Sequence, residues 1–474
     1  MLQFPITRGD AGGATEGTFP SRVSERLAEF LSTARWEHIP ADVRHEAKRS
    51  LMNFFATSLG GCKDAAVEKA AAVLGQFAGS ATATIIGRSE RSDPLNAAFL
   101  NAMSANVFDF DDTHARTIIH PTAPVAPALL ALAETSHIAG QRLLLAFVLG
   151  VETECRVGNA ISPGHYQRGW HITSTCGVFG AAAAVGSMLG LGGERMKWAL
   201  GNASAQASGL VETLGSMAKS ISVGNAARNG LVSALLAERD FFGPDQPLEG
   251  ARGFLRVTGE NPDFSCVTQG LGEHWEILCN AYKPYPCGVV LNPVIEACLE
   301  LSKEPGLIVS EIERIELIGH PLLRERTDRM HVNSGREAQV SAQHGVAVAL
   351  SRGRAGLAEF SDACVADPAL RSLGSKVSFV DDASYALESA RVTVHMRAGR
   401  PALTRFVEKA RGSSERPLSD AELEDKLRDL VQYGASGCEP EPLIRAIWSL
   451  ERADDAGSLM PLAAGRGLTR PASS

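Results

Sequence analysis

Paired cysteines, excess positive charge and aromatic residues are what this chain of 474 residues has least of. Its nine cysteines are scattered singly without a Cys-x-x-Cys pair, which argues against a zinc ribbon, a disulfide framework and an iron–sulfur site. The formal net charge of -8 offers no basic face, so we expect no nucleic-acid partner. Only 6% of the residues are aromatic, whereas alanine and glycine are common, which favours closely packed helices over a β-sandwich.

Targeting signals and membrane spans are not evident either. The first residues include Arg8, Asp10 and Glu16 and no long apolar run, so we expect no secretory signal. Residues 172–193 carry no charge, but they are rich in glycine, serine and threonine, which favours a buried helix with its approach loop over a membrane span. Unpaired cysteines are typical of a reducing compartment, so we predict a cytoplasmic protein without a membrane partner.

The densest polar segment spans residues 106–121, between two alanine-rich helical stretches. Polar groups at this density are costly to bury unless each one is paired, so the segment predicts a functional site. The helix predicted over residues 94–107 brings the carboxylates to its C-terminal end, where the helix dipole destabilises their ionised form. We therefore expect a cation or a proton nearby. The polar residues are Asp109, Asp111, Asp112, Thr113, His114, Thr117 and His120.

Two further polar segments, residues 164–177 and 215–230, each lead into a helix rich in small residues. In the first, serine and threonine fall where the helix begins, and the free N–H groups and positive dipole end there suit an anion such as a carboxylate. His171 lies at the edge of this position. In the second segment, Lys219 and Arg228 are the only cations.

The pattern of the chain changes between about residues 262 and 282, where we place a domain boundary. Before it, apolar residues recur at helical spacing; after it, residues 312–318 and 391–396 alternate as strands, between helices at about 288–302 and 338–352. Such a mixture predicts an α+β domain. From Ser419 the sequence is helical again, with Glu422 in the capping-box position, and we expect this tail to return to the first domain.

Six motifs in one order resemble the MmgE/PrpD family over about residues 21–455. The family includes 2-methylcitrate dehydratase, cis-aconitate decarboxylase and iminodisuccinate epimerase. The motifs are Asp109-Phe-Asp-Asp-Thr with His120-Pro, Gly169-Trp-His171, Gly177-Val-Phe-Gly-Ala-Ala, Lys219 with Gly224-Asn-Ala-Ala-Arg-Asn-Gly, Glu249-Gly-Ala-Arg-Gly-Phe254 and Lys283-Pro-Tyr-Pro-Cys.

The resemblance implies a mainly α fold with a cleft between two domains. A large all-helical domain would be built from both chain ends, residues 20–275 and 405–458, and a smaller α+β lid, residues 276–404, would be inserted between them. We expect residues 1–19 and 459–474 to be disordered. The resemblance also implies a homodimer, a small polycarboxylate substrate and no cofactor or metal.

The resemblance further implies a set of site residues. By similarity to the decarboxylases, Asp109, Thr113, His120, His171, Lys219 and Lys283 line the pocket. We assign His171 and His120 as the acid/base pair without deciding which is the base, Lys219 and Lys283 as carboxylate clamps, and Asp109 with Asp112 as the residues that orient them. Candidate substrate-binding residues are Thr113, Lys283, Asp112, Arg228 and His344.

Two departures from the decarboxylase pattern stand out. The segment from Thr113 to His120 is one residue longer, and Val340-Ser-Ala-Gln-His344 places a histidine where the decarboxylases have a tyrosine. In addition, Gly164-His-Tyr-x-x-Gly-Trp-His resembles the epimerase branch.

The expected chemistry is proton transfer at a carbon next to a carboxylate, for which histidine is a suitable base and fixed cations stabilise the developing charge. We predict a 2-methylcitrate dehydratase-like hydro-lyase. The alternatives within the family are an epimerase of the iminodisuccinate type and a decarboxylase of the cis-aconitate type. Two other classes are a non-catalytic helical scaffold and a divalent-metal enzyme, whose ligands would be Asp109, Asp111, Asp112, His114 and His120.

Overall fold

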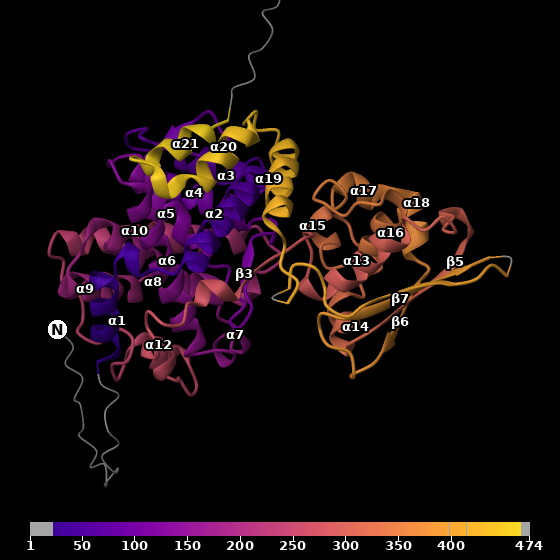
Figure 1. Cartoon of the computed structure of the whole chain (residues 1–474), viewed down its shortest axis with the longest axis horizontal. Coiled ribbons are helices and arrows are strands. Elements are labelled where there is room, and N and C mark those ends of the chain that lie inside the picture. Colours follow the sequence, from indigo (N-terminus) through magenta and orange to yellow (C-terminus); the bar gives the residue numbers. More distant parts are fainter. Residues whose placement is uncertain (1–21, 398, 414, 466–474) are drawn as a thin grey trace, which may run out of the picture.

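The computed structural model describes residues 22–397, 399–413 and 415–465, and each structural statement below concerns these residues. Within them the chain forms a large helical body followed by a smaller α+β part, and then returns to the body with its last helices (Figure 1). The predicted mainly α fold is confirmed. Residues 1–19, for which the sequence predicts disorder, lie outside the described residues.

The helical body is formed from both ends of the chain, together with two small two-stranded sheets. Its helices are α1 (Val23–Thr33), α2 (Ala41–Gly61), α3 (Ala65–Leu74), α4 (Pro94–Asn106), α5 (Thr122–Ala133), α6 (Gly140–Asn159), α7 (Gly164–Gln167), α8 (Ile172–Leu189), α9 (Gly193–Ser204), α10 (Ala218–Glu238), α11 (Phe254–Thr258), α12 (Ser265–Thr268), α19 (Asp420–Gly434), α20 (Pro440–Trp448) and α21 (Leu459–Leu462). Its strands are β1 (Ala83–Thr84), β2 (Arg91–Ser92), β3 (Asp112–His114) and β4 (Asn280–Tyr282).

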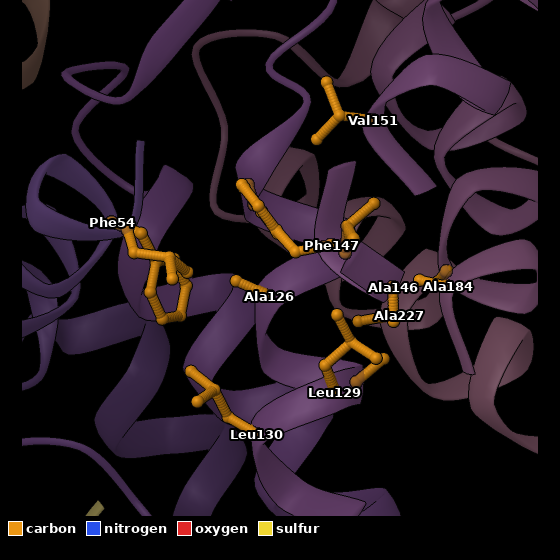
Figure 2. Packing of buried hydrophobic residues seen from close by; sticks show 14 of the residues in the cluster. Phe54, Ala126, Leu129, Leu130, Ala146, Phe147, Val151, Ala184 and Ala227 are labelled. Atoms are coloured by element: carbon orange, nitrogen blue, oxygen red, sulfur yellow. The ribbon is translucent and has the colours of Figure 1, made fainter. Parts of the chain in front are cut away.

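Small residues let the central helices of the body approach closely. A Cβ atom added at Gly180 of α8 would lie 2.9 Å from the backbone oxygen of Gly150 of α6, and one at Gly230 of α10 would lie 2.8 Å from that of Val178. Such close contact fills the core at high density with few large side chains. Figure 2 shows the result, in which Ala184 and Ala227 pack near Leu129 and Phe147.

Helix α8 is the one described helix that is long and apolar enough to cross a membrane by length and composition. In the structure 89% of it is buried among the other helices of the body, as expected for a core helix.

The α+β part contains a four-stranded sheet in the order β6-β5-β7-β8, in which β5 pairs parallel with β6 and antiparallel with β7, and β7 pairs antiparallel with β8. Helices α13 and α16 pack against it, so its apolar face is covered. The elements are α13 (Asn292–Leu301), α14 (Pro321–Thr327), α15 (Gly335–Ala338), α16 (Ala342–Arg352), α17 (Asp362–Ala366), α18 (Pro368–Gly374), β5 (Ile312–Gly319), β6 (Val377–Asp381), β7 (Ala390–Met396) and β8 (Leu403–Val407).

Separate apolar clusters occupy the two parts. One of them, in the α+β part, runs from Tyr285 to Val407, whereas Trp275, Ile277 and Tyr282 belong to the core of the helical body. The division at residues 276 and 404 stays a prediction. In the structure β4 pairs with β3 of the body, and β8 completes the sheet of the α+β part.

The last helices return to the body, and α19 lies on the side that faces the α+β part (Figure 1). The predicted capping box forms between Ser419 and Glu422. The sequence predicts disorder from residue 459, whereas Leu459 and Met460 are buried in α21 and Ala464 forms a bridge with Ile86. This expectation is corrected for residues 459–465, because their apolar side chains pack on the body; residues 466–474 lie outside the described residues.

Candidate active site

A cavity of about 210 Å³ lies where the loop after α4, the beginnings of α8 and α10 and the segment after β4 meet. Four segments that are far apart in the sequence therefore contribute to one hollow. The lining residues are Asp109, Thr113, Ile118, His120, Tyr166, His171, Ile172, Thr173, Leu214, Lys219, Lys283, Gly288 and Val289.

Asp109 is the anion at the centre of this site. It lies three residues beyond the end of α4, with a left-handed φ of 54°, and its carboxylate forms ion pairs with the ammonium groups of Lys219 and Lys283. Lys283 Nζ is 2.6 Å from Oδ2 and 2.7 Å from the backbone oxygen of Asp109. Burial would raise the pKa of Asp109, but the two lysines outweigh it and hold this pKa well below its usual range. The cation expected beside these carboxylates is thus present twice.

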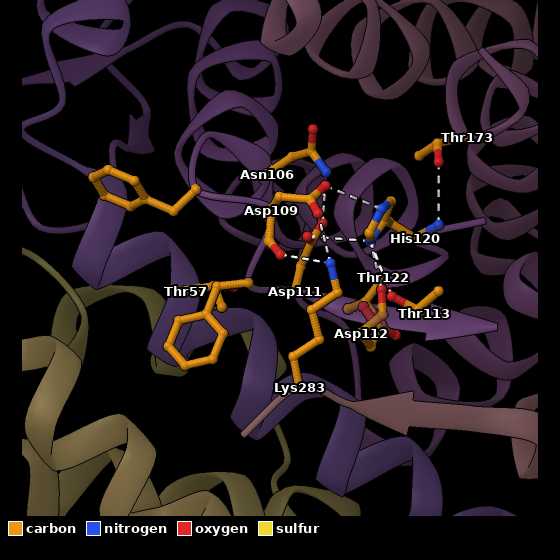
Figure 3. A network of polar contacts seen from close by, with 12 residues as sticks. Thr57, Asn106, Asp109, Asp111, Asp112, Thr113, His120, Thr122, Thr173 and Lys283 are labelled. Carbon is orange, nitrogen blue, oxygen red and sulfur yellow. Dashed lines mark hydrogen bonds and ion pairs between the residues drawn. The ribbon is translucent and has the colours of Figure 1, made fainter. Parts of the chain in front are cut away.

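His120 lies between two carboxylates (Figure 3). Its Nδ1 is 2.8 Å from the backbone oxygen of Asp112 and 3.2 Å from Oδ1 of Asp111. Since both of these oxygens only accept, Nδ1 carries the proton. The other ring nitrogen, Nε2, lies 3.4 Å from Oδ1 of Asp109. His120 therefore presents Nε2 on the side of the cavity where a proton can be received or given.

His171 immediately precedes α8 and is almost fully buried. Its Nδ1 lies 3.2 Å from the hydroxyl oxygens of both Ser174 and Ser222. Those hydroxyls donate to the backbone oxygens of His171 and Lys219, so they accept from Nδ1–H, and Nε2 is left with a free lone pair. Burial, Lys219 and His120 lower the pKa of His171 to about 3, so its imidazole is neutral near pH 7.

Positive charge and backbone donors line the same cavity. Lys219 and Lys283 are 7% and 5% exposed, so water screens them little. The first-turn N–H groups of α8, at Ile172 and Thr173, have no acceptor within the helix and can bind an anion. Thr173 also accepts a hydrogen bond of 3.2 Å from the His120 amide, which fixes the loop against the start of α8. The arrangement suits a ligand with more than one carboxylate.

Two buried carboxyl groups lie behind the cavity. Oδ2 of Asp112 accepts hydrogen bonds from Thr122 at 2.5 Å and from Asn280 at 2.9 Å. Burial and the charge of Asp111 raise the pKa of Asp112 to about 7. Deeper in the core, burial and Asp112 raise the pKa of Glu154 well above its usual range. Asp112 thus supports His120 through its backbone oxygen, while its side chain points to the interior.

The sequence of the chain matches the models of one family. The model of the MmgE/PrpD N-terminal domain matches residues 25–267, and that of the MmgE/PrpD C-terminal domain matches residues 285–451. The chain belongs to the MmgE/PrpD family. The resemblance drawn from its motifs is confirmed.

Similar MmgE/PrpD proteins match this chain over nearly their whole length. A cis-aconitate decarboxylase-like protein of Aspergillus oryzae is 28% identical over 95% of this chain and 99% of its own length. The cis-aconitate decarboxylase of Aspergillus terreus is 27% identical over 93% of this chain and 96% of its own. That of Homo sapiens is 26% identical over 94% and 95%. The family is thus one of enzymes, and these relatives carry the name of a lyase.

Six of the residues expected for an MmgE/PrpD site line the cavity: Asp109, Thr113, His120, His171, Lys219 and Lys283. Two others do not. His344 lies in the α+β part, where its Nε2 is 2.8 Å from the backbone oxygen of Glu359 and its ring packs on Phe360. Arg228 is on α10, hydrogen-bonded to Asn225 and stacked over the ring of Phe99. These local partners hold both side chains away from the cavity.

Other lining residues have no part in the expectations from sequence. Tyr166 belongs to the same polar segment as His171, so its position was a signal that could have been followed. Ile118, Leu214 and Val289 are apolar residues, and 38–48% of each is exposed. They can be recognised as lining residues only from the folded structure, in which their segments come together.

The donor set also bears on the divalent-metal alternative. Asp109, Asp111 and His120 offer atoms that lie within 4.8 Å of one another. A cation held there would face the ammonium groups of Lys219 and Lys283, which already bind Asp109. Since like charges repel strongly where water is scarce, this donor set fits a divalent cation poorly.

Proposed function

We propose that this MmgE/PrpD chain is a lyase that needs no cofactor, transfers a proton next to a carboxylate of a small polycarboxylic acid, and decarboxylates an acid like cis-aconitate. The single observation that carries the proposal is the pair His120 and His171 beside Lys219 and Lys283. Each histidine has its Nδ1 proton committed to a protein acceptor, so each offers Nε2 to a ligand held by the lysines. The similar decarboxylases favour this reaction over the 2-methylcitrate dehydratase expected from the motifs.

In the proposed reaction the lysines and the start of α8 hold the substrate carboxylates. One carboxylate leaves as CO₂ when its bond to carbon breaks, and the bonding electron pair stays on the substrate, where the neighbouring carboxylate and the two ammonium groups stabilise it. A proton from an imidazole then adds to carbon, and solvent returns a proton to the histidine. We assign His120 as the proton donor, because two carboxylates accompany its ring. We assign the neutral His171 as the group that takes up the returning proton from solvent and passes it to His120.

Incubation in D₂O tests the proposal. We expect cis-aconitate to release CO₂ and to yield a product with one deuterium on carbon, detected by NMR. A panel of citrate-like and aspartate-like acids run in parallel distinguishes the alternatives. Loss or gain of water without CO₂ would favour the dehydratase, and deuterium exchange at an α-carbon without net reaction would favour the epimerase. Absence of exchange with every acid would refute the proton-transfer chemistry.

We also propose that the chain forms a homodimer in the cytoplasm, as the family resemblance implies. Light scattering on the purified protein tests the first part, and fractionation of cells tests the second.

A further inference from the structure

Lys426 of α19 is a buried lysine that the reaction above does not use. Only 8% of it is exposed, and its Nζ donates three hydrogen bonds: to Oδ1 of Asn53 at 2.8 Å and to the backbone oxygens of Phe110 at 2.8 Å and Lys283 at 2.9 Å. The three N–H groups of an ammonium are thereby matched to three acceptors. Among the described residues no carboxylate forms an ion pair with it. Burial lowers the pKa of Lys426 well below its usual range, and the carboxylate of Asp111 opposes this without forming an ion pair. A cation buried here is costly, so its position calls for a function.

The two backbone oxygens belong to the segments that form the centre of the active site. Phe110 stands between Asp109 and Asp111, and Lys283 is the lysine whose ammonium binds Asp109. The same nitrogen lies 3.7 Å from the centroid of the Phe110 ring, a cation–π contact that further fixes this loop. One side chain thus ties together, from behind, the two segments whose side chains meet in the cavity.

Lys426 does not itself reach that cavity. It lines a separate hollow of about 250 Å³ together with Phe110, Pro284, Tyr285 and Leu430, and no residue lines both. Lys426 therefore cannot contact the substrate, and its direct link to the site is the backbone that it holds.

We propose that Lys426 is a positioning residue of the active site, which sets the separation between Asp109 and Lys283 by holding the backbone oxygens of Phe110 and Lys283. The expected effect on turnover rests on the proposed function, whereas the effect on the separation between Asp109 and Lys283 does not depend on it. The left-handed backbone at Asp109 makes this role needed, since a strained loop keeps its conformation only when its surroundings hold it.

The kinetic test is Lys426→Ala with Lys197→Ala as a matched control. Lys197 of α9 is also a largely buried lysine, but it pairs with Glu194 of the same helix and with Asp245, which follows α10, and it does not line the cavity. We expect kcat per folded molecule to fall about 100-fold in Lys426→Ala, the scale of a misplacement of about 1 Å, with a smaller change in KM. The control should keep the wild-type kcat. Circular dichroism at the assay temperature gives the folded fraction, and Lys426→Met, which keeps the apolar stem, replaces the alanine variant if that does not fold.

Chemical rescue separates positioning from mere loss of packing. Truncation opens the space of Lys426 to the neighbouring hollow, so ethylammonium can enter and donate hydrogen bonds, whereas tetramethylammonium cannot donate. Recovery of kcat with the first ion and not with the second supports the inference. Equal effects of both ions, or an unchanged kcat in the variant, would overturn it.

A crystal structure of the variant tests the geometric part without any substrate. Lys283 Nζ lies 2.6 Å from Oδ2 of Asp109 in the wild-type chain, and we expect this ion pair to be broken or displaced in Lys426→Ala. An unchanged pair would refute the inference even if the wild-type enzyme is active. If the Lys283–Asp109 ion pair is displaced in the variant but the wild-type protein turns over none of the acids, the positioning role stands and the proposed function is refuted.

Discussion

Replacement of Asp112 by asparagine should make the stability of the protein less sensitive to pH. The carboxyl of Asp112 is fully buried, and burial together with Asp111 raises its pKa from the ordinary 3.8 to about 7. The folded state therefore keeps a proton that the unfolded chain has already lost. Between these two values folding takes up a proton, so the stability contributed at this position decreases as the pH rises and is lowest above about pH 7.

The size of the effect follows from the same two values. A difference of about three pKa units corresponds to about 4 kcal/mol in the free energy of unfolding. The wild type loses this stability as the pH rises, whereas the variant, which has no carboxyl group at this position, does not. Asparagine can replace the protonated carboxyl, because its oxygen can accept from Thr122 and Asn280 as Oδ2 does. We expect the free energy of unfolding of Asp112→Asn, relative to wild type, to increase by up to about 4 kcal/mol between about pH 4 and pH 8.

Urea unfolding followed by tryptophan fluorescence at several pH values measures this difference. Asp111→Asn is the matched control, because the pKa of Asp111 is lowered. Burial opposes that lowering and His120 causes it, so Asp111 is ionised in both states above about pH 5. Because the charge of Asp111 contributes to the raised pKa of Asp112, the control removes part of that shift. Its free energy of unfolding relative to wild type should therefore increase with pH by less than that of Asp112→Asn. If the free energies of unfolding of wild type and Asp112→Asn change with pH in the same way, the reasoning is refuted.

Three further predictions concern the histidine, the deeper carboxyl and the metal alternative. His171→Gln should retain its circular dichroism but lose at least about 100-fold in turnover, because a neutral acid/base group is removed; full activity by NMR would exclude His171 from the mechanism. Glu154→Gln should raise the thermal unfolding temperature more at pH 8 than at pH 5, because burial raises the pKa of Glu154 and the wild type becomes less stable as the pH rises. A lower unfolding temperature of the variant at both pH values would contradict this assignment. Removal of divalent ions with a chelator should leave turnover unchanged, because Lys219 and Lys283 occupy Asp109; a loss that Mg²⁺ restores would favour the metal enzyme.

Features that depend on neighbouring residues could be predicted from the sequence. The capping box of Ser419 and Glu422 and the strands β5 and β7 follow from local spacing, and both were found. The polar loop around Asp109 stood out because its density of charge has no place in a core without partners. The short strands β4 and β8 have no comparable local signal and depend on their pairing partners.

Prediction from the sequence fails for side chains whose position depends on contacts with residues that are distant in the sequence. Lys426 falls among alternating charges of an amphipathic helix, a pattern typical of a solvent-exposed face. It is buried because α19 docks on α2 and on the segments of Phe110 and Lys283. The sequence pattern predicts that His344 binds substrate, yet a backbone oxygen at Glu359 holds its ring in the α+β part. Motif spacing identifies which residues can carry the chemistry, but convergence of the loops decides which of them meet.

The position of Lys426 on α19 has a consequence for synthesis of the protein. Every residue that lines the catalytic cavity precedes residue 290, so all of them leave the ribosome before Lys426 does. On the proposal above, a nascent chain carries the full set of reactive groups for some time without the tie that aligns them. The enzyme would thus reach its full rate only after its final helices have been translated and have docked, and a premature stop codon ahead of α19 would leave the reactive groups without the lysine that aligns them.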